Sequence, residues 1–257
     1  MGNLFNAILF EPFLNGLVFI YQYVGDLGLS IIILTVIIKL LLYVPSRSSI
    51  RSQKALQKTQ PKLKEIQEKY KNNKEELGRQ LMKFYKENKV NPFSSCLPLL
   101  IQLPILIGLY RAFYAVAQID PTTHILVADQ LQHLYEPLRN IFTQRAVDPS
   151  FLSLFDLSQN KNYLFAIMAG AAQFWQGKML MVKQPPRVPG AKDESVAAGV
   201  NKQMMYFMPI LTVFFGMQFP AGLTLYWLVS TLFTIVQQYL VFRKDTIKET
   251  VSSHEPH

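Results

Sequence analysis

The chain has 257 residues, of which 50% are hydrophobic and only 17% are charged, whereas soluble domains carry about 25% charged residues. Its 26 Lys and Arg against 17 Asp and Glu give a formal net charge of +9. The composition excludes a disordered or collagen-like chain, and the single cysteine, Cys96, excludes an internal disulfide. A chain this apolar and this basic indicates a membrane protein whose charges are concentrated in particular segments.

The first segment, residues 1–27, contains Glu11 and Asp26 but no Lys or Arg. Residues 4–23 are apolar and aromatic, with Glu11, Pro12 and Asn15 as interruptions. We therefore expect an external amphipathic helix that lies in the membrane interface, and a sixth span is the less favoured interpretation. Because no basic segment precedes the apolar residues, a cleavable signal peptide is not expected.

Five apolar runs follow. A helix rises 1.5 Å per residue, so crossing a bilayer core of roughly 30 Å takes about 20 residues. The predicted transmembrane helices are residues 28–45, 95–119, 162–182, 204–219 and 222–242. The fourth run is slightly short, and we expect it to thin the bilayer locally.

The charge lies mainly in residues 46–94, which hold 13 Lys or Arg and five Asp or Glu. The positive-inside rule places this segment in the cytoplasm. The loop 120–161 is then external, and the linker 183–203 and the tail 243–257 are cytoplasmic. Apolar residues at helical spacing on both sides of the turn at 71–74 predict a basic helical hairpin. Two interpretations stay open: an arm that contacts anionic lipid, ribosomal RNA or a client, or a solvated hairpin that only enforces topology.

Lys39 is the clearest polar group inside a predicted span, with Thr35 one turn before it on the same face. An ionisable residue at mid-membrane is expensive, so it suggests a functional site. The alternative is that the Lys39 side chain reaches toward the interface near Pro45, since a long aliphatic stem can cover part of that distance.

Other spans also have a polar face. In the last span Trp227, Thr231, Thr234 and Gln238 are spaced 4-3-4 and form one stripe, with Ser230 and Gln237 beside it. In the third span Gln173 shares a face with small residues, and the second span carries Gln102. These faces indicate either a wet cavity or ordinary helix packing through small residues and interhelical hydrogen bonds.

Catalytic motifs are absent from the sequence. It contains no phosphate-binding loop, no nucleophile elbow, no zinc-protease motif and no intramembrane carboxylate pair. We therefore expect no enzyme activity, no cofactor and no metal site.

Three stretches resemble the YidC-type membrane insertases, the bacterial relatives of the mitochondrial and chloroplast oxidase-assembly insertases. Residues 90–104 read VNPFSSCLPLLIQLP and are similar to the element that follows the family's hairpin. Residues 207–243 resemble its last two spans, including FP-x-GL-x-LYW and a pair of glutamines, and residues 30–45 resemble its first core span. The similarity extends over residues 20–243.

The resemblance implies an ATP-independent insertase with a five-helix core around a hydrophilic groove that is closed to the outside. The family carries an Arg in the first core span, and Lys39 stands at that position, which keeps the charge but loses the guanidinium fork. The resemblance and the polar stripes together predict a client-binding groove. Its residues are Lys39, Thr35, Gln173, Trp227, Tyr226, Thr231, Thr234, Gln238 and Gln102.

The expected partners are nascent membrane proteins and the lipid bilayer, with the Sec translocon, the signal-recognition-particle receptor and the ribosome left open, and no DNA. The expected location is a bacterial plasma membrane, with the N-terminus outside and the C-terminus in the cytoplasm. A small-solute transporter or channel with an intramembrane Lys site is the alternative, although no inverted repeat supports it. A passive assembly chaperone is a second rival.

Overall fold

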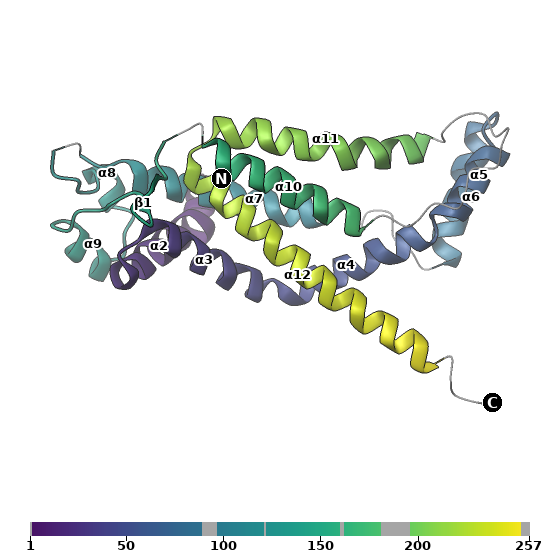
Figure 1. Ribbon diagram of the computed structural model, residues 1–257, viewed down its shortest axis with the longest axis horizontal. Helices are drawn as coiled ribbons and strands as arrows, with labels where there is room; N and C mark the ends of the chain where they lie inside the picture. The colour runs from purple at the N-terminus through teal and green to yellow at the C-terminus, as the bar shows by residue number, and fades with distance from the viewer. Residues whose placement is uncertain (1, 89–96, 121, 160–161, 181–195, 253–257) are drawn as a thin grey trace.

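The computed structural model describes residues 2–88, 97–120, 122–159, 162–180 and 196–252, most of which are helical (Figure 1). In chain order the elements are α1 (Gly2–Phe5), the π-helical turn η1 (Asn6–Phe10), α2 (Glu11–Val24), α3 (Leu27–Leu41), α4 (Tyr43–Lys58), α5 (Gln60–Lys69), α6 (Lys74–Glu87), α7 (Leu97–Ala117), α8 (Ala128–Leu131), α9 (Glu136–Phe142), β1 (Ser150–Phe151), β2 (Phe155–Asp156), α10 (Tyr163–Met179), α11 (Val196–Gln218) and α12 (Ala221–Ser252).

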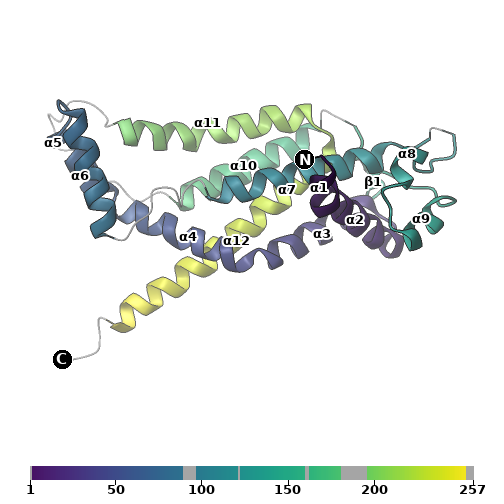
Figure 2. The same cartoon turned by 180° about the vertical axis from the view of Figure 1, so that it is seen from behind.

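Helix α12 connects the parts of the bundle. It packs mainly against α10 and α3 and also contacts α4, α7 and α11, while α10 packs closely on α11 and α2 covers α3 and α7 (Figures 1 and 2). Small residues permit the close approach of α10 and α11. A Cβ atom added at Gly170 would lie 2.4 Å from Cγ2 of Val213, and one at Gly216 would lie 3.1 Å from Cβ of Ala166.

Three helices of the described part are long and apolar enough to cross a membrane: Asn6–Val24, Leu100–Ala117 and Ala221–Arg243. The bent pair Leu27–Leu41 and Tyr43–Leu56 is a fourth candidate, and Met205–Gln218 is a shorter apolar helix. The predicted class is an all-α membrane protein, and the chain is a mostly helical membrane protein with one short two-stranded sheet formed by β1 and β2, while the count of five spans stays a prediction. Asn6–Val24 has the length and composition of a span, which was the less favoured interpretation of the N-terminal segment, and the interfacial helix stays a prediction.

The first predicted span is interrupted. Helices α3 and α4 meet at Leu42 with a bend of 69°. Pro45 has no backbone N–H, so the carbonyl of Leu41 loses its partner in the helix, and a bend results there. Gln237 of α12 holds the bend from outside, because its Nε2 donates to the Tyr43 carbonyl at 3.0 Å and its Oε1 accepts from Oγ of Ser46 at 2.8 Å.

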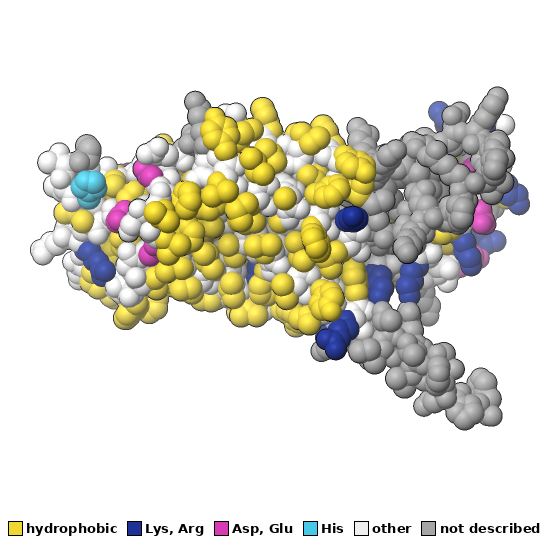
Figure 3. Space-filling view, viewed as in Figure 1, with side chains coloured by type: hydrophobic (Ala, Val, Ile, Leu, Met, Phe, Trp, Pro, Cys, Tyr) yellow, Lys and Arg dark blue, Asp and Glu magenta, His cyan; other side chains and the backbone are white. Residues whose placement is uncertain are grey.

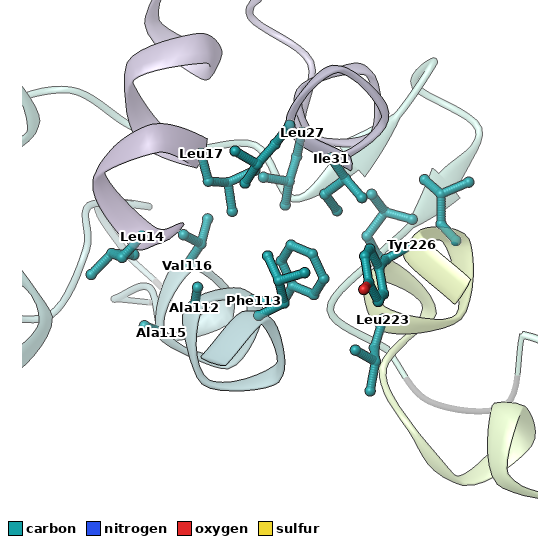
Figure 4. Close-up of a cluster of buried hydrophobic side chains, with 14 of the residues drawn as sticks. Leu14, Leu17, Leu27, Ile31, Ala112, Phe113, Ala115, Val116, Leu223 and Tyr226 are labelled. Atoms are coloured by element: carbon teal, nitrogen blue, oxygen red, sulfur yellow. The ribbon is translucent and has the colours of Figure 1, made fainter. Parts of the chain in front are cut away.

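The apolar core lies where α2, α3, α7 and α12 converge (Figure 4). Burying a large aliphatic or aromatic side chain stabilises the fold by about 1.5–3 kcal/mol. Each of these four helices contributes side chains that are at most 6% exposed: Leu14, Leu17, Leu27, Ile31, Ala112, Phe113, Ala115, Val116, Leu223 and Tyr226.

The segment between α7 and α10 covers the end of the bundle where α2 meets α3. Asn15 ties it to α2, since its Nδ2 donates to the His133 carbonyl at 2.9 Å and its Oδ1 accepts from the Tyr135 N–H. Asp26 ties it to α3, because its Oδ2 accepts from the Leu152 N–H at 2.6 Å. The N–H of Gly222 at the start of α12 donates to the Leu157 carbonyl. One loop therefore contacts three separate helices.

At the opposite end of the molecule, α5 and α6 lie side by side, with Leu63 and Phe84 buried between exposed charged residues (Figures 1 and 2). Asn73 is the N-cap of α6, and its Oδ1 accepts from the Glu76 N–H. Two helices extend beyond the predicted spans: α11 begins at Val196, within the predicted linker, and α12 continues to Ser252, within the predicted tail. Hydropathy marks where an apolar run ends, but a helix also continues through polar residues of good helix propensity.

Candidate functional site

Lys39 lies on α3 toward α12. Its side chain is half-buried, and Nζ is 3.5 Å from Oγ1 of Thr234. One turn earlier, Thr35 is buried and donates its hydroxyl to the Ile31 carbonyl at 2.6 Å. The two residues therefore share a helix face, as their spacing predicts, and the ammonium of Lys39 contacts another helix.

The stripe on α12 divides into two parts. The hydroxyls of Thr231 and Thr234 donate to the carbonyls of Trp227 and Ser230, each at 2.9 Å. Both hydroxyl hydrogens therefore have their acceptors within the same helix. A hydroxyl oxygen that donates in this way can still accept a hydrogen bond. Oγ1 of Thr234 accepts one from Nζ of Lys39. The Trp227 side chain is half-buried.

The paired glutamines have different roles. Gln237 is buried and bonded to Tyr43 and Ser46 at the bend of α3 and α4. Gln238 is 1% exposed, and its Oε1 has no hydrogen-bond partner within the described part of the chain. A buried acceptor without a partner is unfavourable, so this amide oxygen stands out as an unsatisfied acceptor inside the bundle.

We call the contacts between α12 and the bent α3–α4 pair the polar seam: Lys39 with Thr234, and Ser46 with Gln237. Ser46 lies at the start of the predicted hairpin segment, and it was not among the predicted groove residues. Its signal was weak, because a serine next to Pro45 is also typical of an ordinary turn or helix start.

Two other predicted groove residues pair away from Lys39. The Nε2 of Gln102 in α7 donates to the Tyr226 hydroxyl of α12, whose ring also packs near Phe113. Oε1 of Gln173 in α10 accepts from the hydroxyl of Thr212 in α11. Thr212 did not stand out in the sequence, since it is a single hydroxyl in an apolar, Met-rich run. These bonds join neighbouring helices, which is the packing interpretation of the polar faces.

The outer faces of the same helices are apolar. Figure 3 shows a continuous hydrophobic surface over the middle of the molecule, with charged side chains gathered toward its ends. Among the residues at least 37% exposed are Leu29, Ile33, Ile37 and Leu40 on α3, Leu100, Leu103 and Ile107 on α7, and Leu232, Val236, Tyr239 and Leu240 on α12. A continuous apolar surface over several helices fits contact with lipid.

Among the described residues, no group of three or more His, Cys, Asp or Glu could hold a metal ion. The site is thus a set of polar contacts between apolar helices, and Lys39 is the cation among its predicted residues.

These features define a multi-pass helical membrane protein with polar contacts inside its helical bundle. Residues 19–249 match the family model described as 60Kd inner membrane protein, and the chain belongs to that family. It is 34% identical over 244 residues to a protein of Geobacter sulfurreducens named "Membrane protein insertase YidC", covering 95% of this chain and 39% of the relative. A Syntrophus aciditrophicus protein of the same name is 36% identical over 231 residues, covering 90% of this chain and 35% of the relative.

The chain therefore spans less than two fifths of the length of these relatives. The resemblance seen in the sequence to the YidC-type insertase family is confirmed.

Proposed function

We propose that this chain is a membrane protein insertase that moves short external segments of client proteins through a positively charged polar groove and releases their helices into lipid without ATP. The observation that carries the proposal is the contact between Lys39 of α3 and Thr234 of α12. It places a cation and a hydroxyl together between helices whose outer faces are apolar.

The energetic argument starts from the client. A polar segment that enters a bilayer loses its hydration, which is unfavourable unless new hydrogen bonds replace it. Lys39 supplies a positive charge for an acidic client segment, and Oε1 of Gln238 is a buried acceptor without a partner in the described residues. A charged residue at mid-membrane itself costs about 2.5–3.5 kcal/mol on insertion scales, so its presence there favours a functional role.

The driving force comes from the client's own apolar helix. The exposed apolar residues of α3 and α12, such as Ile33, Ile37 and Val236, lie on the outer faces of the two helices whose contact includes Lys39 and Thr234. A client helix that slides along these faces passes from a partly polar surface into lipid. The transfer of its apolar area releases free energy at about 25 cal/mol per Å², which removes the need for ATP.

The proposed partners are nascent membrane proteins and the lipid bilayer, and the names of the relatives support this assignment. The proposed location is a bacterial plasma membrane with the N-terminus outside. The basic hairpin of α5 and α6 is then cytoplasmic and meets the client first. The Sec translocon, the signal-recognition-particle receptor and the ribosome stay as predicted partners.

Reconstitution into sealed liposomes tests the proposal with a single-span client that has a short acidic external segment. Wild type and Lys39→Arg should insert the client, whereas Lys39→Ala should abolish insertion. Lys178→Ala, which removes an exposed cation in the last turn of α10, is the matched control and should insert like wild type.

Insertion by Lys39→Ala at the wild-type rate would overturn the groove-cation mechanism. Solute flux without client insertion would instead support a transporter. Assembly of client subunits without insertion by the purified protein would support a passive chaperone.

A further inference from the structure

Helix α4 carries a stripe of basic residues. Arg47, Arg51, Lys54 and Lys58 are spaced 4-3-4, which places them on one helix face. The surrounding sequence has no compensating acid, since residues 27–64 contain seven Lys or Arg and no Asp or Glu. Residues 195–244, which include α12 as far as its basic end, also contain no Asp or Glu. Arg47, Arg51 and Lys54 therefore have no Asp or Glu within ten residues in the sequence, whereas Asp245 lies two residues after Arg243.

The stripe begins where the apolar surface ends. Leu41 and Val44, at the bend between α3 and α4, are 77% and 76% exposed. In Figure 3, dark-blue Lys and Arg side chains border the hydrophobic surface at the end toward α4 and the distal part of α12. An apolar surface that ends at basic groups complements an anionic phospholipid. The acyl chains contact the apolar surface, and the phosphate at the boundary of the membrane core meets the basic groups.

The basic groups are held in place by packing between α4 and α12. Gln237 bonds to Tyr43 and Ser46, and Ile50 is buried. Nζ of Lys54 lies 4.9 Å from the ring centroid of Phe242, and the next residue, Arg243, is exposed. Basic residues from two helices are thus brought together at one junction.

We propose that the α4–α12 junction, with Arg47, Lys54 and Arg243, binds the phosphate headgroup of an anionic phospholipid whose chains lie against Leu41 and Val44. Arg47 and Arg243 can each offer two parallel N–H donors to phosphate oxygens, and Lys54 adds a third positive charge. The proposal does not depend on insertase activity, because it concerns lipid retained by the resting protein. It also goes beyond charge-directed topology, since it requires particular positions and not only net charge.

The test measures lipid retained by the purified full chain in a mixture of phosphatidylglycerol and phosphatidylcholine with identical acyl chains, by native mass spectrometry. The variant Arg47→Gln/Lys54→Gln/Arg243→Gln removes the proposed site. The control Lys71→Gln/Lys74→Gln/Lys86→Gln removes three exposed charges from the hairpin and gives the same net charge. Wild type and control should prefer phosphatidylglycerol, whereas the site variant should lose the preference, by about fivefold for each charge removed.

Equal loss in both triple variants, or no preference in wild type, would overturn the proposal. If the site variant does not fold, Arg243→Gln alone, at an exposed position, should weaken phosphatidylglycerol retention by about fivefold; unchanged retention would count against the site. Excess glycerol phosphate should leave the bound lipid in place. Its displacement by glycerol phosphate would assign the site to free phosphate and overturn the lipid assignment.

Discussion

The ammonium of Lys39 in α3 lies 3.5 Å from the hydroxyl oxygen of Thr234 in α12, although the two residues are 195 positions apart in the chain. This contact joins the one cation within α3 to the polar stripe of the last helix. It is a long hydrogen bond, so it orients the Lys39 side chain more than it stabilises the fold.

Thr234→Val tests this relationship, because valine keeps the shape of threonine and removes the hydroxyl. Combined with Lys39→Met in a double-mutant cycle, it should show a coupling free energy below about 1 kcal/mol in unfolding, yet reduce insertion of an acidic client several-fold. Thr143→Val is the control, since its hydroxyl donates to the Arg139 carbonyl and the residue lies outside the proposed groove. Strict additivity of Lys39→Met with Thr234→Val in the insertion assay would contradict the assignment.

Tyr226→Phe should destabilise the fold by about 1–2 kcal/mol, because the amide of Gln102 loses its acceptor inside the bundle. Urea unfolding in detergent measures the effect. The double variant Tyr226→Phe/Gln102→Leu should recover part of the loss, since neither partner then remains unpaired. Tyr114→Phe, at a residue 51% exposed on the same helix as Gln102, should leave the stability unchanged. A Tyr226→Phe protein as stable as wild type would show that the bond contributes nothing.

Gly170→Ala should destabilise the fold by about 1–3 kcal/mol, because the added methyl group would overlap Val213 and force α10 away from α11. Gly177→Ala is the matched control on the same face. Its Cβ would lie 3.7 Å from Met205, an ordinary contact, so the better helix propensity of alanine should stabilise it by up to about 1 kcal/mol. Equal unfolding midpoints for the two variants would refute the close approach of these helices.

Asp26→Ala should loosen both α3 and the loop between α7 and α10. Asp26 is the N-cap of α3: one carboxylate oxygen accepts from the Leu29 N–H at 2.8 Å, and the other accepts from the Leu152 N–H. We expect a loss of about 1–2 kcal/mol and faster hydrogen exchange at both amides. Asp129→Ala is the control in the same loop. The Asp129 carboxylate accepts only a local hydrogen bond from Gln132, so this variant should leave the two amides protected. Similar exchange in both variants would argue against the link.

Asp120 gives a pH-dependent prediction outside the membrane. Backbone hydrogen bonds from Thr123 and then Thr122 lower its pKa below the usual 3.8. A carboxyl with a lowered folded pKa stabilises the folded loop above pH 3.8, and that contribution is lost as pH falls through the folded value. An NMR titration of the carboxyl should therefore give a midpoint below 3.8, whereas a midpoint at or above it would contradict the contacts. Asp120→Asn should remove this part of the pH dependence.

Hydropathy and spacing predicted much of the architecture, but they treat each segment separately. They located Lys39 and the stripe of Thr231, Thr234 and Gln238, because these polar groups contrast with apolar neighbours. They did not predict that Thr212 pairs with Gln173 or that Gln237 holds the bend at Tyr43. Such partners come from distant segments, and a single hydroxyl or amide gives no local signal of its partner.

The sequence alone determined that this is a helical membrane protein, that its positive charge is concentrated after the first core helix, and that Lys39 interrupts an apolar run. Each follows from local composition, since the transfer of apolar and charged groups between water and lipid is decided residue by residue. Only the tertiary structure decided which helix Lys39 faces, where α3 bends and which side chains share hydrogen bonds. Those outcomes depend on the packing of α12 against helices far away in the chain, where small residues allow close approach and buried polar groups must find partners.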